Sequence, residues 1–139
     1  MNAAGRFPQS YENVPVRKAL DAINAAPTLE ALDALLDAAL TGGLVVDVTG
    51  STEESGTRIR TIASTAGEPV LPLFTSMKAL RDAVGAAAGK GTQVQAIIIP
   101  AREALALIES ADFVAVQFNP GTNTMIVARS HIESALSGP

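Results

Sequence analysis

The chain has 139 residues, of which 47% are hydrophobic, and carries 14 acidic against 10 basic residues for a net charge of −4. This length supplies one hydrophobic core, and the scatter of Lys and Arg among acids argues against a nucleic acid or an anionic membrane as partner. The absence of cysteine excludes disulfides and cysteine-ligated metal centres, and with no secretory leader and no apolar run near the ~20 residues of a spanning helix we expect a cytoplasmic protein.

Residues 1–13 are polar and contain Gly and Pro, so we expect a flexible N-terminal arm. Phe7 and Tyr11 leave a second interpretation open, in which these two aromatic side chains hold the segment against the rest of the chain. We expect residues 14–139 to form a single domain.

Two helices are predicted after this arm. Val16, Leu20 and Ile23 recur at helical spacing, and Pro27 prevents the first helix from continuing. Thr28 is a favourable N-cap for the second helix. The apolar stripe of that helix comprises Leu29, Leu32, Leu35, Leu36 and Leu40. The two helices should form a hairpin that covers a sheet.

Three strands are predicted next, at residues 44–48, 57–62 and 70–74. Their simplest arrangement is an antiparallel meander. The middle strand alternates, and it places Arg58 and Arg60 together on one solvated face. Pro72 has no N–H group to donate, which places the third strand at a sheet edge or at a bulge.

A helix over residues 77–84, with Ser76 as its N-cap, precedes a strand at residues 94–99. That strand contains Ile97-Ile98-Ile99 and does not alternate. Because a strand that is apolar on both faces is buried on both faces, we expect it in the middle of the sheet. Another helix is predicted over residues 102–110, and the two crossovers favour local parallel pairing.

The last predicted elements are a strand at residues 113–118, a turn at residues 119–122 and a returning strand at residues 124–128. Ser130 and Glu133 fit a capping box that starts a C-terminal helix. The resulting order is ααβββαβαββα. It predicts an α/β fold with α+β features, built on a single mixed sheet of about six strands flanked by helices.

Three segments resemble the SseB-type domain in their order and separation: Glu68 to Ser76, Arg102 to Leu105, and Phe118 to Gly121. The resemblance spans nearly the whole chain. That family is named for an enhanced serine sensitivity phenotype and brings no agreed enzymatic activity. The resemblance implies a bacterial domain of unknown function, and the alanine-rich composition is compatible with an actinobacterial member. Longer members carry a further C-terminal domain, whose function is not carried over here.

The candidate binding rim comprises Phe74, Thr75, Ser76, Asn119, Pro120 and Gly121. The simplest interpretation is structural, with hydroxyls that cap a helix and a Pro-Gly turn. If the two strands that precede these segments run parallel, both segments lie on one rim of the sheet. A small ligand or anion could then bind there, at strand ends beside a helix N-terminus.

The other patterns give no catalytic set. Residues 85–92 superficially resemble a phosphate loop, but the glycine spacing is wrong and Gly91 follows Lys90. His131 is the only histidine, so we expect no metal site, and no G-x-S-x-G elbow supports a hydrolase triad. Glu53 and Glu54 fit a solvated loop.

We therefore expect a non-enzymatic binding or interaction domain without a cofactor. Its partner would be another protein or a second copy of the chain. The alternative is a small-molecule or anion sensor that uses the rim near Thr75, Ser76 and Asn119. A third and weaker alternative is an enzyme of unrecognised type.

Overall fold

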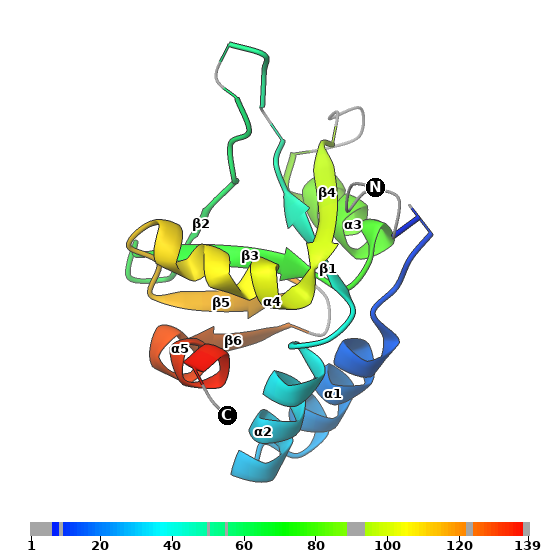
Figure 1. Ribbon diagram of the computed structural model, residues 1–139, viewed down its shortest axis with the longest axis vertical. Helices are drawn as coiled ribbons and strands as arrows, with labels where there is room; N and C mark the ends of the chain where they lie inside the picture. The colour runs from blue at the N-terminus through cyan, green and yellow to red at the C-terminus, as the bar shows by residue number, and fades with distance from the viewer. Residues whose placement is uncertain are drawn as a thin grey trace.

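A computed structural model describes residues 7–8, 10–49, 51–54, 56–88, 94–121 and 124–137, with the side chains of residues 85–88 left aside (Figure 1). The predicted order of helices and strands is confirmed. The elements are α1 (Val14–Ala25), α2 (Leu29–Ala38), β1 (Gly43–Asp47), β2 (Ile62–Ala63), β3 (Pro69–Phe74), α3 (Met77–Ala88), β4 (Ala96–Pro100), α4 (Ala101–Ala106), the short 3-10 helix η2 (Leu107–Ser110), β5 (Ala115–Phe118), β6 (Met125–Ala128) and α5 (Arg129–Ser137).

One mixed sheet joins the strands in the order β4-β1-β3-β5-β6, and β2 pairs with the first part of β3. The β3–β5 pair is parallel, and every other pair is antiparallel. Because β3 and β5 run parallel side by side, the segments that follow them leave the sheet at the same end. This topology confirms the mixed-sheet prediction and positions the candidate rim.

The prediction of a central isoleucine strand is wrong. Within the described residues β4 pairs only with β1, so it forms an edge of the sheet, and Ile97 is 40% exposed. Its two faces are only partly covered: Ile98 packs with the α3 side of the core and Ile99 with the opposite side, but no residue of β4 is fully buried. The apolar run reflects apolar contacts on both faces of the strand, and it gives no information about a hydrogen-bonded neighbour in the plane of the sheet.

The predicted strand at residues 57–62 is largely wrong, because β2 comprises only Ile62 and Ala63. On that side of β3, β1 pairs with Leu73 and Phe74, and β2 pairs with Pro69 and Val70. The free length of β3 is therefore too short for a longer partner. Arg58 and Arg60 lie outside the sheet, and the Arg60 N–H donates to the Asp47 carbonyl at 2.9 Å.

Pro72 was expected at an edge or a bulge, and β3 is instead an inner strand. Pro72 lies between the part of β3 that pairs with β1 and the part that pairs with β2. On its other side it is in register with Gln117 of β5. The missing N–H group is therefore accommodated at the gap between two partner strands, where no ladder bond is required.

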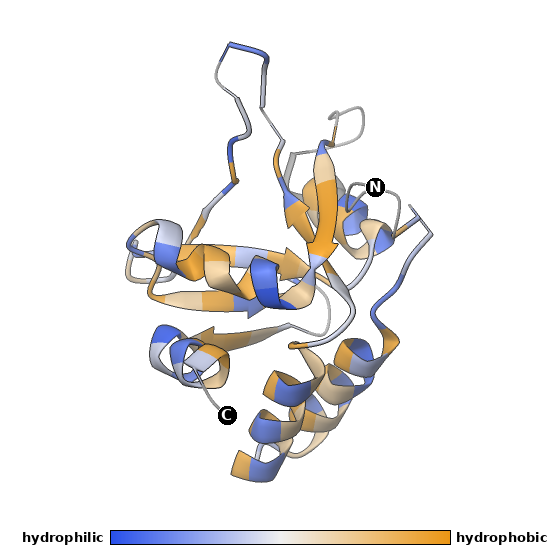
Figure 2. Cartoon of the chain, in the orientation of Figure 1, coloured by the Kyte–Doolittle hydropathy of each residue, from blue (hydrophilic) through white to orange (hydrophobic). Residues whose placement is uncertain are grey.

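The two faces of the sheet carry separate hydrophobic clusters. Helices α1, α2, α4 and α5 pack on one face, where Leu44, Leu71 and Phe118 are fully buried. Helix α3 packs on the other face with Val45 and Phe74. Figure 2 shows the hydrophobic residues gathered along the strands and on the inward sides of the helices. The core is built almost entirely from aliphatic side chains, in keeping with an aromatic content of only 4%.

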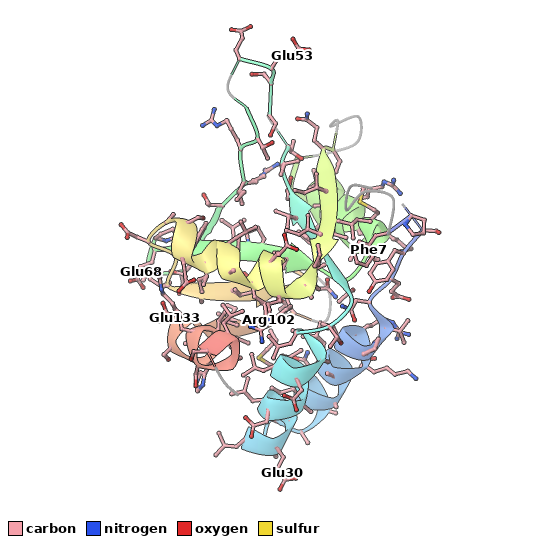
Figure 3. The ribbon with its side chains drawn as sticks, viewed as in Figure 1. Phe7, Glu30, Glu53, Glu68, Arg102 and Glu133 are labelled. Carbon is pink, nitrogen blue, oxygen red and sulfur yellow. The ribbon has the colours of Figure 1, made fainter. Side chains whose placement is uncertain are left out.

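The segment before α1 is held by its aromatic side chains. The rings of Phe7 and Tyr11 meet edge to face with centroids 4.9 Å apart, and the Tyr11 hydroxyl accepts from the Gly43 N–H at 2.8 Å. Phe7 lies beside the start of the chain in Figure 3. For residues 7–8 and 10–13 these contacts support the anchored interpretation, and residues 1–6 and 9 lie outside the described residues.

Two helix predictions need correction. Leu29 was assigned to the buried stripe of α2, but it is the first residue of the helix and is 78% exposed, whereas Leu35 and Leu36 are buried. Helix α5 begins at Arg129, before the predicted Ser130 cap. Glu133 does not close a capping box and instead accepts from Arg129 Nε at 2.9 Å. The rest of the phosphate-loop-like segment, at residues 89–92, lies outside the described residues.

Candidate functional site

The two halves of the rim meet where β3 and β5 end. The Thr75 N–H donates to Asn119 Oδ1 at 2.9 Å, and Asn119 Nδ2 donates to Thr75 Oγ1 at 3.0 Å. Both residues are buried. The parallel pairing of β3 with β5 thus produces the juxtaposition expected from the sequence. The paired side chains satisfy each other, so their main physical effect is to tie one strand end to the other.

Asn119 adopts the left-handed backbone conformation with φ of +46°. Its N–H donates to the Leu73 carbonyl at 2.8 Å, which extends the β3–β5 ladder by one bond. Asparagine tolerates this conformation better than other non-glycine residues. The turn continues through Pro120 to Gly121 with φ of +95°, as expected for a Pro-Gly pair in a type II turn.

Ser76 caps α3, because its Oγ accepts from the Ala79 N–H at 3.1 Å. The N-terminal segment closes over the same place. Glu12 forms an isolated β-bridge with Ser76, and the Asn13 N–H donates to the Thr75 carbonyl at 2.8 Å. The side chains of Thr75, Ser76 and Asn119 therefore each have a structural partner.

Thr75, Ser76 and Asn119 line a hollow of about 290 Å³, which we call the polar hollow. Its charged lining residues are Glu12, Arg17, Asp21, Lys78 and Asp82. Arg17 bridges to Glu12 at 2.9 Å and to Asp21 at 3.7 Å, and Lys78 bridges to Asp82 at 2.8 Å. The Asp82 carboxylate, which accepts a hydrogen bond from Lys78, raises the pKa of Lys78 above its ordinary value of 10.5.

The other half of the rim lies elsewhere. Phe74 and Pro120 line a smaller hollow of about 120 Å³, the apolar hollow, on the face of the sheet that carries α3. Asp47 and Arg60 also line it. The predicted rim is therefore not one surface, since its polar residues and its apolar residues face different hollows. Gly121 is exposed and lines neither hollow.

A third hollow was not predicted from the sequence. It has a volume of about 460 Å³ and lies between the tip of the α1–α2 hairpin and β6. We call it the β6 groove. Ile23, Leu29 and Leu32 line its helical side, Met125 and Ile126 line its strand side, and His131 of α5 completes it. Leu29 is 78% exposed and Ile126 is 55% exposed. The one available signal was β6 itself, whose apolar residues do not alternate with polar ones.

The described residues lack two further features. Within these residues, no three His, Cys, Asp or Glu side chains converge in an arrangement that could hold a metal ion. None of the helices described is both long and apolar enough to cross a membrane.

Comparison with known proteins adds the family. No curated protein matches the chain at a significant level. The SseB protein N-terminal domain, in contrast, matches residues 16–134, a range that contains β3, β5, the rim and the β6 groove. The match covers most of the chain and agrees with the resemblance carried by Phe74 to Ser76 and by Asn119 to Gly121. The chain therefore belongs to the SseB family through its N-terminal domain.

Proposed function

We propose that this SseB domain is a non-enzymatic, cytoplasmic binding domain that docks a protein partner in the β6 groove. One observation carries the proposal. Among the described residues, the large hydrophobic side chains that are exposed are Leu29, Ile97 and Ile126, and two of these three line the same groove. Exposed apolar residues on both sides of one hollow are a feature of docking surfaces.

The rim supports this choice by contrast. The side chains of Thr75 and Asn119 hydrogen-bond to each other, and the Ser76 hydroxyl caps α3. A ligand at the rim would have to replace these bonds. At the β6 groove, burial of a Leu or Ile side chain contributes about 1.5–3 kcal/mol and costs no existing hydrogen bond.

A photo-crosslinking experiment tests the proposal. A photoreactive amino acid is placed at Leu29 and, in a matched variant, at Ile97, which is the exposed hydrophobic residue on the opposite edge of the sheet. Irradiation in cells of the native host should join a defined partner protein to position 29 and leave position 97 without that product. Equal products at both positions, or no product at position 29, would contradict docking in the groove.

A second candidate function is anion sensing at the polar hollow. The observation in its favour is that Arg17 and Lys78 line a hollow of about 290 Å³ next to the N-terminus of α3. Against it, Glu12, Asp21 and Asp82 line the same hollow and outnumber the two bases. Titration of the 15N-labelled domain with inorganic phosphate decides the matter. Saturable shifts of the Ser76 to Lys78 amides, lost in Arg17→Ala, would establish this function.

A further inference from the structure

The outer edge of β6 has main-chain groups available for pairing. The Arg129 N–H donates to the Val114 carbonyl, and the antiparallel register with β5 runs from Ala115–Ala128 to Phe118–Met125. Bonded and non-bonded pairs alternate along such a ladder. The N–H groups of Ile126 and Ala128 and the Ile126 carbonyl therefore point away from β5. Within the described part of the chain, β6 has no strand on that side.

This edge forms one side of the β6 groove, so hydrogen-bonding groups and apolar side chains are presented together. The groove lining contains no Asp, Glu, Lys or Arg, and His131 is its single titratable side chain. A helix cannot use the outward groups of β6, because its own N–H and C=O groups are already bonded. An extended segment can bond to the edge and direct alternate side chains to the groove.

The helix beside the groove carries negative charge. Glu30, Asp33 and Asp37 are exposed on α2, and α2 contains no Lys or Arg. Figure 3 shows Glu30 at the far end of the α1–α2 hairpin, directed into solvent. An occupant of the neighbouring groove is therefore favoured if basic residues flank its apolar part.

We infer that the occupant is an extended segment of a partner protein, apolar at alternate positions and flanked by Lys or Arg, which adds to the sheet as a strand beside β6. The inference rests on the proposed docking function and names the chemistry of the partner. A second copy of this chain fits less well. Pairing β6 with β6 of another copy would bring two α2 helices of like charge to one interface.

The test uses a displayed library of random linear peptides panned against the purified domain. The enriched peptides should lack proline in their central part, alternate apolar residues there and carry basic flanks. Binding of a selected peptide should weaken at least about tenfold in Leu29→Lys, which loses an apolar contact and adds a charge of the same sign as the basic flanks of the peptide. It should stay within about twofold in Ile97→Lys, the matched control on the opposite edge.

Ala128→Pro tests the strand geometry separately, because it removes one outward N–H group and leaves the other groove side chains in place. Val127 before it already has the extended conformation that a following proline requires. We expect affinity for the selected peptide to fall about fivefold or more, with an unchanged circular dichroism spectrum.

Three outcomes would overturn the inference. The selected peptides could be amphipathic helices, their binding could survive both Leu29→Lys and Ala128→Pro, or the purified domain could be a dimer that Ile126→Glu converts to monomers. A defined crosslinked partner at position 29 together with any of these results would leave docking in the groove intact and remove only the strand-addition step. Failure of the crosslink itself would remove the docking function.

Discussion

Replacement of Asn119 by Ala tests the structural role of the family hallmark. The change leaves the buried Thr75 N–H without its 2.9 Å acceptor, which costs about 1–3 kcal/mol. It also removes the 3.0 Å hydrogen bond to Thr75 Oγ1. In addition, it holds an alanine at φ of +46°, a left-handed backbone conformation that costs an alanine about 1–2 kcal/mol. We expect the free energy of unfolding to fall by about 3–5 kcal/mol, a large share of the 5–15 kcal/mol typical of a small domain.

Urea denaturation followed by circular dichroism measures this loss. Asn119→Gly is the matched variant, since glycine loses the same hydrogen bonds but accepts the left-handed backbone. It should be more stable than Asn119→Ala by about 1 kcal/mol. If Asn119→Ala lies within about 0.5 kcal/mol of the parent chain, the rim does not tie β3 to β5. If Gly and Ala are equal, the backbone conformation contributes nothing.

Three further predictions concern single contacts. Gly42 has φ of +73°, and a Cβ there would lie 2.6 Å from the Tyr11 hydroxyl. Gly42→Ala should therefore lower the free energy of unfolding, measured by urea denaturation, by at least about 1–2 kcal/mol. Gly67→Ala is the control and should lower it less, because nothing lies within 4 Å of its Cβ. Arg129 donates to Glu133 and to the Ala111 and Phe113 carbonyls, so Arg129→Met should lower stability by about 1–3 kcal/mol, and an unchanged thermal midpoint would contradict this. Asp82→Asn should lower the pKa of Lys78 measured by NMR titration. Because that pKa is raised in the folded state, the ion pair stabilises the fold below the unfolded Lys pKa near 10.5 and loses its effect as the pH rises through the folded value.

The local chemistry of the helices was readable from the sequence. Thr28 accepts from the Ala31 N–H and Ser76 accepts from the Ala79 N–H, as their positions before apolar stripes predicted. The burial of Val16, Leu20 and Ile23 on α1 follows from helical spacing alone. These features depend on residues within about two turns of each other, where propensity and capping rules apply.

The arrangement of strands in the sheet was less readable. The run Ile97 to Ile99 indicated apolar contacts on both faces of the strand. The sequence does not show whether such a strand also has a hydrogen-bonded partner strand on each side within the sheet. Leu29 was assigned to the buried stripe because it precedes Leu32 at helical spacing, yet it lies at the free end of the α1–α2 hairpin where no element covers it within the described residues. Both errors arise from contacts between segments far apart in the chain.

The candidate site was half predicted. The pairing of Thr75 with Asn119 follows from the parallel arrangement of β3 and β5, which the sequence left as a condition. The two crossovers had favoured parallel partners for β4, and that prediction is wrong because β4 pairs antiparallel with β1. The sequence analysis did not foresee that Phe74 and Pro120 lie on another face. Side chains alternate along every strand, so the Phe74 side chain points to the face opposite that of Leu73. The β6 groove depends on where the α1–α2 hairpin lies relative to β6, which no local pattern specifies.

Amide hydrogen exchange of the domain with and without a saturating selected peptide tests most directly whether recognition lies at β6 or at the rim. The account predicts that the Ile126 and Ala128 amides slow by about tenfold or more on binding, while the Thr75 amide, already bonded to Asn119, stays unchanged. Protection that appears at Ser76 to Lys78 and is absent from β6 would contradict it.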